Sequence, residues 1–333
     1  MKFRNRQLKI TILLLFLTLI VLLPSENRQY TGHQSNYGYQ KVIAYMSNQG
    51  IIENKQKWHQ LVHQTGNCRS IQSVKELNNI LHQGNKHSSA AKSAKSYDVV
   101  NYPTTSKYGN LRIINVPTFS SENKVAVKKY RTLLHRQIKL LKNKDHIILN
   151  FANNRGGDPQ AMIAGLATLI PDGTLFTKIA QNGHKYNFIK NKHRIYDSKS
   201  HETTELPVNK QLSSPKIYVI TNEKTASAAE FAIIALKNNK NTKIIGYPTA
   251  GYTSVNTLLK INHKAEVANI TTGTVVSKTM IGGKRHFNNE PITPDKTTLY
   301  EPASTTTHNS TEKPVSLDPD FIKELNNLIN TEH

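Results

Sequence analysis

The apolar residues follow two different periods along the chain, and each period predicts a different kind of element. Between residues 40 and 85 they recur at helical spacing, which predicts a small helical N-terminal region at 39–85. A polar stretch at 86–106 predicts a loop. Short apolar runs then predict strands at 111–116, 147–151, 175–179, 186–196, 216–220, 243–246, 257–261, 267–271 and 274–277.

Helical patterns alternate with these strands at 125–141, 158–169 and 225–236. The order strand, helix, strand, helix, strand from 147 to 246 predicts an α/β layer with crossover connections. Residues 300–316 are poor in apolar side chains and predict a loose segment, and a last helix is expected to begin at Asp318-Pro319. We therefore expect an α/β domain at 86–299, followed by a loose segment and a C-terminal helix at 300–333.

The first 24 residues have the pattern of a targeting segment. Four basic residues precede an uncharged apolar run from Ile10 to Leu23, which is shorter than the roughly 20 residues of a spanning helix. Since no clear cleavage site follows, residues 1–24 are interpreted as either a signal peptide or an N-terminal membrane anchor. Both place the body outside the cytoplasmic membrane, beyond a polar linker at 25–38.

Charge limits the possible partners. The chain has 44 basic and 22 acidic residues and a net charge of +22, so the body without its first 24 residues has about +18. No nucleic-acid-binding motif is present. The expected partner of this basic protein is therefore an anionic cell wall or an anionic membrane surface. The single cysteine, Cys68, excludes an internal disulfide framework and a cysteine-based zinc site.

Two strand-to-helix junctions are candidates for chemistry. The first contains Gly156 and Gly157 before a helix that begins at Asp158-Pro159. Paired glycines permit positive φ angles, and free N–H groups there can bind an oxyanion, although an ordinary tight turn explains the same pattern. The second is Thr225-Ala-Ser-Ala-Ala-Glu230, where Ser227 has the placement of a nucleophile. The alternative for Ser227 is a helix N-cap, with Glu230 as its capping-box carboxylate.

A serine nucleophile needs a base, and His87 is the candidate. It lies in the polar stretch beside Ser88 and Ser89, but the chain has 14 histidines, so spacing alone does not place it near Ser227.

Three blocks of sequence, taken together, resemble the tail-specific (C-terminal processing) serine peptidase family. They are NFANNRGGDPQAMIAGL, IYVITNEKTASAAEF and GYPTAGYTSVN, which span about 110 residues between positions 150 and 256. The resemblance implies a layered sheet-and-helix fold similar to crotonase and Clp-type proteases. It also implies a serine-type peptidase that needs no metal or organic cofactor.

The resemblance also implies roles for individual residues. Tyr252 stands where the processing peptidases have a catalytic lysine, so the chain is more similar to the branch of the tricorn core protease, which pairs serine with histidine. His87 is then the base for Ser227, and Ser88 and Glu290 are expected to orient it. Asp295 is an alternative to Glu290 on structural grounds only. The oxyanion donors are expected to be the backbone N–H groups of Gly157 and Ala228.

Other positions depart from the family pattern. Asn150 stands where an aspartate is usual and Ala152 where an arginine is usual. The helical stretch before His87 is too short for a PDZ domain.

The expected function is a secreted or membrane-anchored, extracytoplasmic serine peptidase that cleaves a protein or peptide through an acyl-enzyme. One alternative is an inactive relative that binds a peptide, a lipid or an anionic wall polymer. Another is a purely structural cell-wall protein whose positive charge does the binding.

Overall fold

The computed structural model describes residues 35–64, 71–93, 95, 98–141, 146–206, 215–261, 266–302 and 316–331. The predicted signal or anchor at 1–24 and most of the predicted linker lie outside these residues. Among the described helices, none has the length and apolarity needed to cross a membrane.

A six-stranded sheet forms the centre of the main body. Its order is β16-β12-β11-β6-β4-β3, and every neighbouring pair is parallel except β3 with β4. The strands are β3 (Thr104–Tyr108), β4 (Leu111–Asn115), β6 (His146–Asn150), β11 (Lys216–Thr221), β12 (Thr242–Gly246) and β16 (Lys296–Thr297). The inner strands are continuous apolar runs because helices cover both faces of this sheet.

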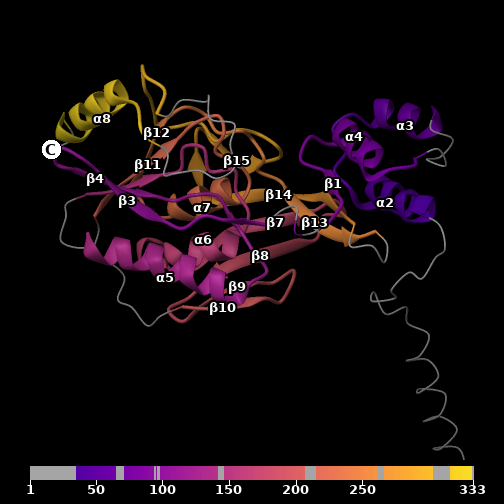
Figure 1. Cartoon of the computed structure of the whole chain (residues 1–333), viewed down its shortest axis with the longest axis horizontal. Helices are drawn as coiled ribbons and strands as arrows, with labels where there is room; N and C mark the ends of the chain where they lie inside the picture. The colour runs from indigo at the N-terminus through magenta and orange to yellow at the C-terminus, as the bar shows by residue number, and fades with distance from the viewer. Residues whose placement is uncertain are drawn as a thin grey trace, which may run out of the picture.

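Alternate residues of β6 enter two different cores. Ile147 and Leu149 pack against the helices of one face, whereas Ile148 packs against the C-terminal helix on the other. The first face is covered by α5 (Lys124–Leu140), α6 (Pro159–Gly165) and α7 (Ala228–Leu236), with a short 3₁₀ turn, η2 (Ala167–Leu169), after α6. The other face is covered by α8 (Pro319–Thr331), as Figure 1 shows.

A second, antiparallel sheet packs against α7 through its strands β7 and β14. Its order is β1-β14-β7-β8-β9-β10, with β13 and β15 also paired to β14. The strands are β1 (Ser89–Ala91), β7 (Gly173–Ala180), β8 (Lys185–Lys190), β9 (Arg194–Asp197), β10 (Thr203–Glu205), β13 (Val255–Lys260), β14 (Val267–Ile281) and β15 (Lys284–Phe287). Phe176, Phe188 and Val275 of this sheet share one core with α5, α6 and α7, so the main body is layered.

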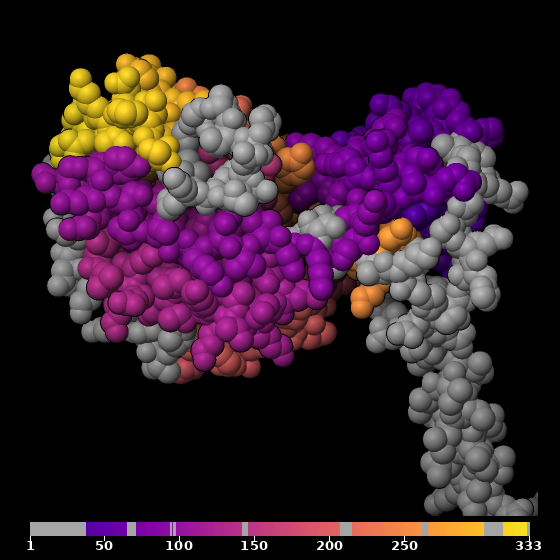
Figure 2. Space-filling view, viewed as in Figure 1, coloured from indigo at the N-terminus to yellow at the C-terminus, as the bar shows by residue number. Residues whose placement is uncertain are grey.

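The N-terminal helices form a lobe at one end of the molecule (Figure 2). They are α2 (Ser35–Gln49), α3 (Lys55–Gln64) and α4 (Val74–Gly84). Met46, Trp58 and Leu81 of this lobe pack together with Ala268 and Ile270 of β14. The lobe is therefore continuous with the antiparallel sheet through a shared apolar core.

The α/β fold class and the helical N-terminal region predicted from sequence are confirmed. Four local predictions were wrong. The stretch 86–106 contains β1, most of β3 and β2 (Val99–Val100), which pairs with β5 (Phe119–Ser120), because neighbouring strands recruit polar segments that have no apolar period of their own. The predicted linker ends inside α2, which begins at Ser35. The two strands expected at 267–277 are one long strand, β14, and the single strand expected at 186–196 is divided into β8 and β9.

Candidate active site at the carboxyl edge of the parallel sheet

Three loops meet at one edge of the parallel sheet. Strands β6, β11 and β12 run in the same direction, so the segments that follow each of them emerge together. The Ala226 N–H donates to the Asn154 carbonyl at 2.8 Å, and the Ala250 N–H donates to the Thr225 carbonyl at 2.9 Å. The glycine-pair turn, the Ser227 turn and the turn after β12 are therefore bound to one another.

Ser227 lies at the N-terminus of α7 with φ 55° and ψ −118°. A residue with a side chain rarely adopts this backbone conformation, which costs about 1–3 kcal/mol and is found where the surroundings enforce it. The same combination of strand, strained serine and helix presents the nucleophile in α/β-hydrolases. Ser227 is half-buried, whereas its neighbours Ala226 and Ala228 are buried.

The Glu230 carboxylate lies beneath this turn and is fully buried. It accepts the N–H of Ser227 at 2.7 Å, of Gly251 at 3.0 Å and of Tyr252 at 2.8 Å, together with the Thr249 hydroxyl. Burial raises the pKa of Glu230 to about 7, and these four donors act against the rise. One carboxylate thus joins the Ser227 turn to the turn that carries Tyr252.

The two glycines lie against Ser227. A Cβ atom on Gly156, which has φ 97°, would stand 2.8 Å from both the Ala228 nitrogen and the Ser227 Cβ. The Gly156 carbonyl and the Asp158 N–H pair with Phe119, so the Gly157 N–H faces away from that strand. Ala228 is the first residue of α7, where N–H groups have no partner within a helix.

His87 enters the site from the loop between α4 and β1. Its ring packs edge-on against the Tyr252 ring, with 4.9 Å between centroids, and its Nδ1 lies 2.7 Å from the Ser254 Oγ. Burial, followed by the charge of Lys86, lowers the pKa of His87 to about 4, so its imidazole is neutral at pH 7. In the described part of the chain no hydrogen bond joins His87 to Ser227; such bonds are often long before substrate binds.

A chain of hydrogen bonds continues behind His87. The Ser254 hydroxyl donates to Oδ1 of Asn289 at 2.6 Å, and Nδ2 of Asn289 donates to Oδ1 of Asn85 at 2.9 Å and to the Glu53 carboxylate at 2.8 Å. Asn289 has φ 55°, a left-handed backbone conformation that it shares with Ser227 and with Asn153 of the glycine-pair turn. The helical lobe therefore contributes Glu53, in the connection between α2 and α3, and the Asn85–His87 loop after α4.

Two residues expected to orient His87 bond elsewhere. The buried Ser88 hydroxyl donates to Oγ1 of Thr271 at 3.2 Å, and the Glu290 carboxylate pairs with Lys284 at 2.5 Å near the surface. Their side chains are turned away because neighbouring backbone positions point in different directions. Asp295 pairs with Lys237 at 2.9 Å and accepts the Ile244 N–H, which is a structural role.

Asn150 and Ala152, the two residues that depart from the family pattern, both make contacts that support the fold. Nδ2 of Asn150 donates to Oδ1 of Asn115 at 3.0 Å, and Oδ1 of Asn150 accepts the Ala152 N–H. The Ala152 side chain packs in the core beneath α8. Asn150 therefore belongs to a neutral hydrogen-bond network, and Ala152 belongs to an apolar core.

Sequence reasoning missed Ser254, Asn289, Asn85 and Glu53. Ser254 lies within the GYTSVN block and Asn289 directly precedes Glu290, so the sequence identified the right segments but not the side chains that face His87. Asn85 lies in the segment Gly84-Asn85-Lys86-His87-Ser88, which resembles a family segment imperfectly, but only His87 and Ser88 were singled out there. Glu53 lies outside every segment of the resemblance.

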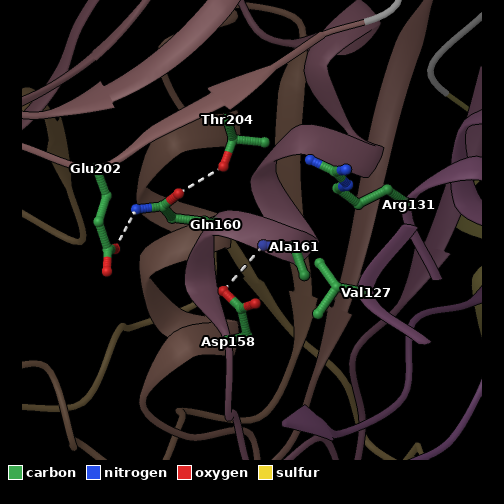
Figure 3. A pocket seen from close by; sticks show the side chains of 7 residues that line it. All are labelled: Val127, Arg131, Asp158, Gln160, Ala161, Glu202 and Thr204. Atoms are coloured by element: carbon green, nitrogen blue, oxygen red, sulfur yellow. Dashed lines mark hydrogen bonds between the residues drawn. The ribbon is translucent and has the colours of Figure 1, made fainter. Parts of the chain in front are cut away.

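A pocket of about 340 Å³ lies beside the glycine pair, between α5, the N-terminus of α6 and the β9–β10 hairpin (Figure 3). Asp158, the residue after Gly157, lines it together with Arg131, Gln160 and Glu202. Nε2 of Gln160 donates to the Glu202 carboxylate at 2.8 Å. Burial raises the pKa of Asp158, although the Ala161 N–H that it accepts acts against the rise. The pocket contains charges of both signs.

Comparisons with known proteins identify similar sequences and similar folds. The nisin-resistance protein of Lactococcus lactis subsp. lactis is 26% identical over 292 residues, which cover 84% of this chain and 89% of that protein. A lipoprotein from Streptococcus agalactiae has a similar structure, with a TM-score of 0.67 and 26% identity over 82% of this chain and 95% of that one. A putative peptidase from Parabacteroides merdae has the same fold at 11% identity, with a TM-score of 0.52 over 80% of this chain and 90% of that one.

The sequence pattern of peptidase family S41 matches residues 110–298, more than half of the chain. This segment contains the glycine pair, Ser227, the turn after β12 and Asn289, whereas His87 lies before it. The chain belongs to peptidase family S41.

Proposed function

We propose that the protein is an extracytoplasmic serine peptidase with Ser227 as nucleophile and His87 as general base. The observation that carries this proposal is the strained Ser227, held against the Gly156-Gly157 turn and bonded through Glu230 to the segment on which His87 packs. Family membership supports a peptidase, and the strain on Ser227 supports a working nucleophile.

The reaction follows from the roles of these groups. The Ser227 hydroxyl attacks the carbonyl carbon of a peptide bond while Nε2 of His87 takes its proton. The tetrahedral intermediate then collapses, the leaving amine takes that proton, and an acyl-enzyme forms on Ser227. Water, activated by the same imidazole, hydrolyses the acyl-enzyme.

The backbone N–H groups of Gly157 and Ala228 would hold the oxyanion of the intermediate. Gly156, which precedes Gly157, lies against Ser227 and the Ala228 nitrogen, and the Gly157 N–H is directed away from the pairing with Phe119. Ala228 is the first residue of α7, where N–H groups have no partner within the helix. Loss of one such donor typically raises the barrier by about 2.7–4 kcal/mol.

The substrate is a peptide or protein, and the pocket beside Asp158 would take one of its side chains. Asp158 is one residue from Gly157, so this pocket lies within reach of a chain whose carbonyl is bound there. Nisin belongs in the substrate panel because the similar protein of Lactococcus lactis is a nisin-resistance protein. The predicted N-terminal signal or anchor places the enzyme outside the cytoplasmic membrane.

A second candidate is a binding protein on the same fold. Tyr252 in place of a catalytic lysine and the lack of a hydrogen bond between His87 and Ser227 in the described residues favour it. In this case the site around Ser227 would hold a peptide without cleaving it.

The test uses the full-length chain and two readouts. A fluorophosphonate probe acylates activated serines whatever their substrate, and a peptide panel that includes nisin is read by mass spectrometry. We expect the probe on Ser227 and cleavage of at least one peptide. Both should be lost in Ser227→Ala and reduced at least 100-fold in His87→Ala, since a general base contributes about 10²–10⁴ in rate.

His59→Ala is the matched control, because His59 is an exposed histidine on α3 of the same helical lobe. It should keep full labelling and cleavage. If the unmutated protein is neither labelled nor active while it still binds a peptide of the panel, the binding protein is the correct alternative.

A further inference from the structure

The hydrogen bonds behind His87 have a direction that can be derived atom by atom. The backbone N–H of His87 is only a donor, and it bonds Oδ1 of Asn85 at 2.9 Å. Nδ2 of Asn85 bonds the Ile51 carbonyl, which is only an acceptor, at 2.9 Å. The fully buried Asn85 therefore has a single possible amide orientation.

Asn85 in turn sets the orientation of Asn289. Since Oδ1 of Asn85 is an acceptor, Asn289 must turn its NH₂ group toward it. The Glu53 carboxylate requires the same orientation, because it also accepts from that group. Oδ1 of Asn289 is then left facing the Ser254 hydroxyl, 2.6 Å away.

The last step reaches the imidazole. A serine hydroxyl has one proton, and Ser254 gives it to Asn289. Ser254 can then only accept from Nδ1 of His87, so Nδ1 must hold the ring proton. This leaves the lone pair on Nε2, which is the atom that a serine nucleophile needs as its base.

We propose that Asn289 is a positioning residue that acts on His87 through Ser254. Asn85 and Glu53 hold Asn289 in one amide orientation, and Asn289 thereby keeps His87 in the tautomer with its proton on Nδ1. The strained φ of Asn289 supports this role, because a strained residue persists only where its contacts enforce it. Asn85 and Glu53 come from the helical lobe, which thus determines the protonation pattern of the base. The effect of this tautomer on the reaction rate rests on the proposed peptidase function, whereas the tautomer itself does not depend on that function.

The test compares Asn289→Leu with Asn256→Leu in the full-length chain. Nδ2 of Asn256 bonds the His87 carbonyl at 3.2 Å, so this control removes an amide near His87 without touching its ring. Long-range ¹H–¹⁵N correlation spectra of ¹⁵N-histidine-labelled protein at pH 7 report the tautomer, and His87→Ala assigns the signal. We expect the Nδ1–H tautomer in the unmutated protein and in Asn256→Leu, and a mixture of tautomers in Asn289→Leu.

Kinetics supply the second readout. A base in the wrong tautomer costs up to about 10⁴ in rate, so Asn289→Leu should lower kcat at least 100-fold and change KM little. Asn256→Leu removes one bond to the His87 backbone but leaves the Ser254–Asn289 bond in place, so it should lower kcat at least tenfold less than Asn289→Leu does. A pure Nε2–H tautomer in the unmutated protein, or an unchanged tautomer in Asn289→Leu, overturns the inference. The spectra decide this even if no variant cleaves a peptide, so failure of the proposed function is recognised separately.

Discussion

At the residue scale, Glu230 and His87 show how burial sets the chemistry of the site. Glu230 is buried among four donors with its pKa raised to about 7, and His87 is desolvated with its pKa lowered to about 4. Glu230 holds the Ser227 turn best as a carboxylate, because only the ionised form has an acceptor site for each of its four donors. His87 acts as a base only when neutral. Both groups are therefore in their active form above their pKa values.

This pattern predicts two transitions on the acid side of the pH profile. As pH falls, kcat/KM should decrease in part through about 7, when Glu230 is protonated, and be lost through about 4, when His87 is protonated. Glu230→Gln imitates the protonated carboxyl, so it should show a reduced plateau and only the lower transition. The measurement is kcat/KM from pH 3.5 to 9, a range of about five units around these pKa values.

Glu122→Gln, an exposed carboxylate, is the control and should reproduce the unmutated profile. Full activity of Glu230→Gln at pH 8 would contradict a positioning role for this carboxylate. A single acid limb at about 6.5, the value of an ordinary histidine, would contradict the burial of His87.

At the scale of elements, the helical lobe is part of the site. Helix α4 leads directly into the loop with Asn85 and His87, and Leu81 anchors that helix in the lobe core. Glu53 reaches Asn289 from the same lobe. Movement of α4 is therefore expected to displace the base before it affects the sheet that carries Ser227.

The prediction compares two equally buried leucines. Leu81→Ala in α4 and Leu325→Ala in α8 each remove a side chain with 0% exposure and should lower the free energy of unfolding by about 2–5 kcal/mol. At a temperature where both variants remain folded, only Leu81→Ala should lower kcat, because α8 packs on the face of the sheet away from the α5–α7 layer. Urea denaturation and steady-state kinetics measure the two effects. An equal loss of kcat in both variants would show that general stability, and not the position of α4, controls activity.

At the scale of the whole molecule, the positive charge of the described residues lies mostly on the surface and takes little part in the packing of the layers. The net charge of +22 is spread over the chain, and helix α5 contains no acidic residue. Lys124, Lys128 and Lys139 are exposed on α5, where they can face an anionic surface without disturbing the core side of the helix.

We predict that α5 contributes to binding of anionic membrane surfaces. Replacing Lys124, Lys128 and Lys139 with glutamine should weaken binding to vesicles rich in phosphatidylserine by about two orders of magnitude at low salt, at about 1 kcal/mol per lysine. Binding should fall steeply toward 1 M salt, where charges are screened beyond about 3 Å, and Ser227→Ala should leave it unchanged. Glutamine at the exposed Lys185, Lys192 and Lys240 is the charge-matched control. Equal losses in the two triple variants would show that net charge alone, and not α5, determines binding.

The sequence by itself determined the parts of this protein that depend on local pattern. Apolar runs without alternation predicted the buried strands around Ile148 and Val219, because a strand covered on both faces has no polar side. The glycine pair and the serine between alanines predicted the two strand-to-helix junctions, because the backbone conformation of a tight turn depends on the residues of the turn itself. The blocks that contain these junctions also predicted the peptidase family.

Only the tertiary structure decided which side chains meet His87. Glu53, Asn85, Ser254 and Asn289 are far apart in the chain, and each has a common residue type in an unremarkable context. Glu290 was predicted in place of Asn289, its neighbour, because adjacent residues point in different directions and sequence does not show which one faces inward. The direction of the hydrogen bonds behind His87 depends on contacts between residues that are remote in the chain. These contacts form only when the helical lobe packs on the sheet.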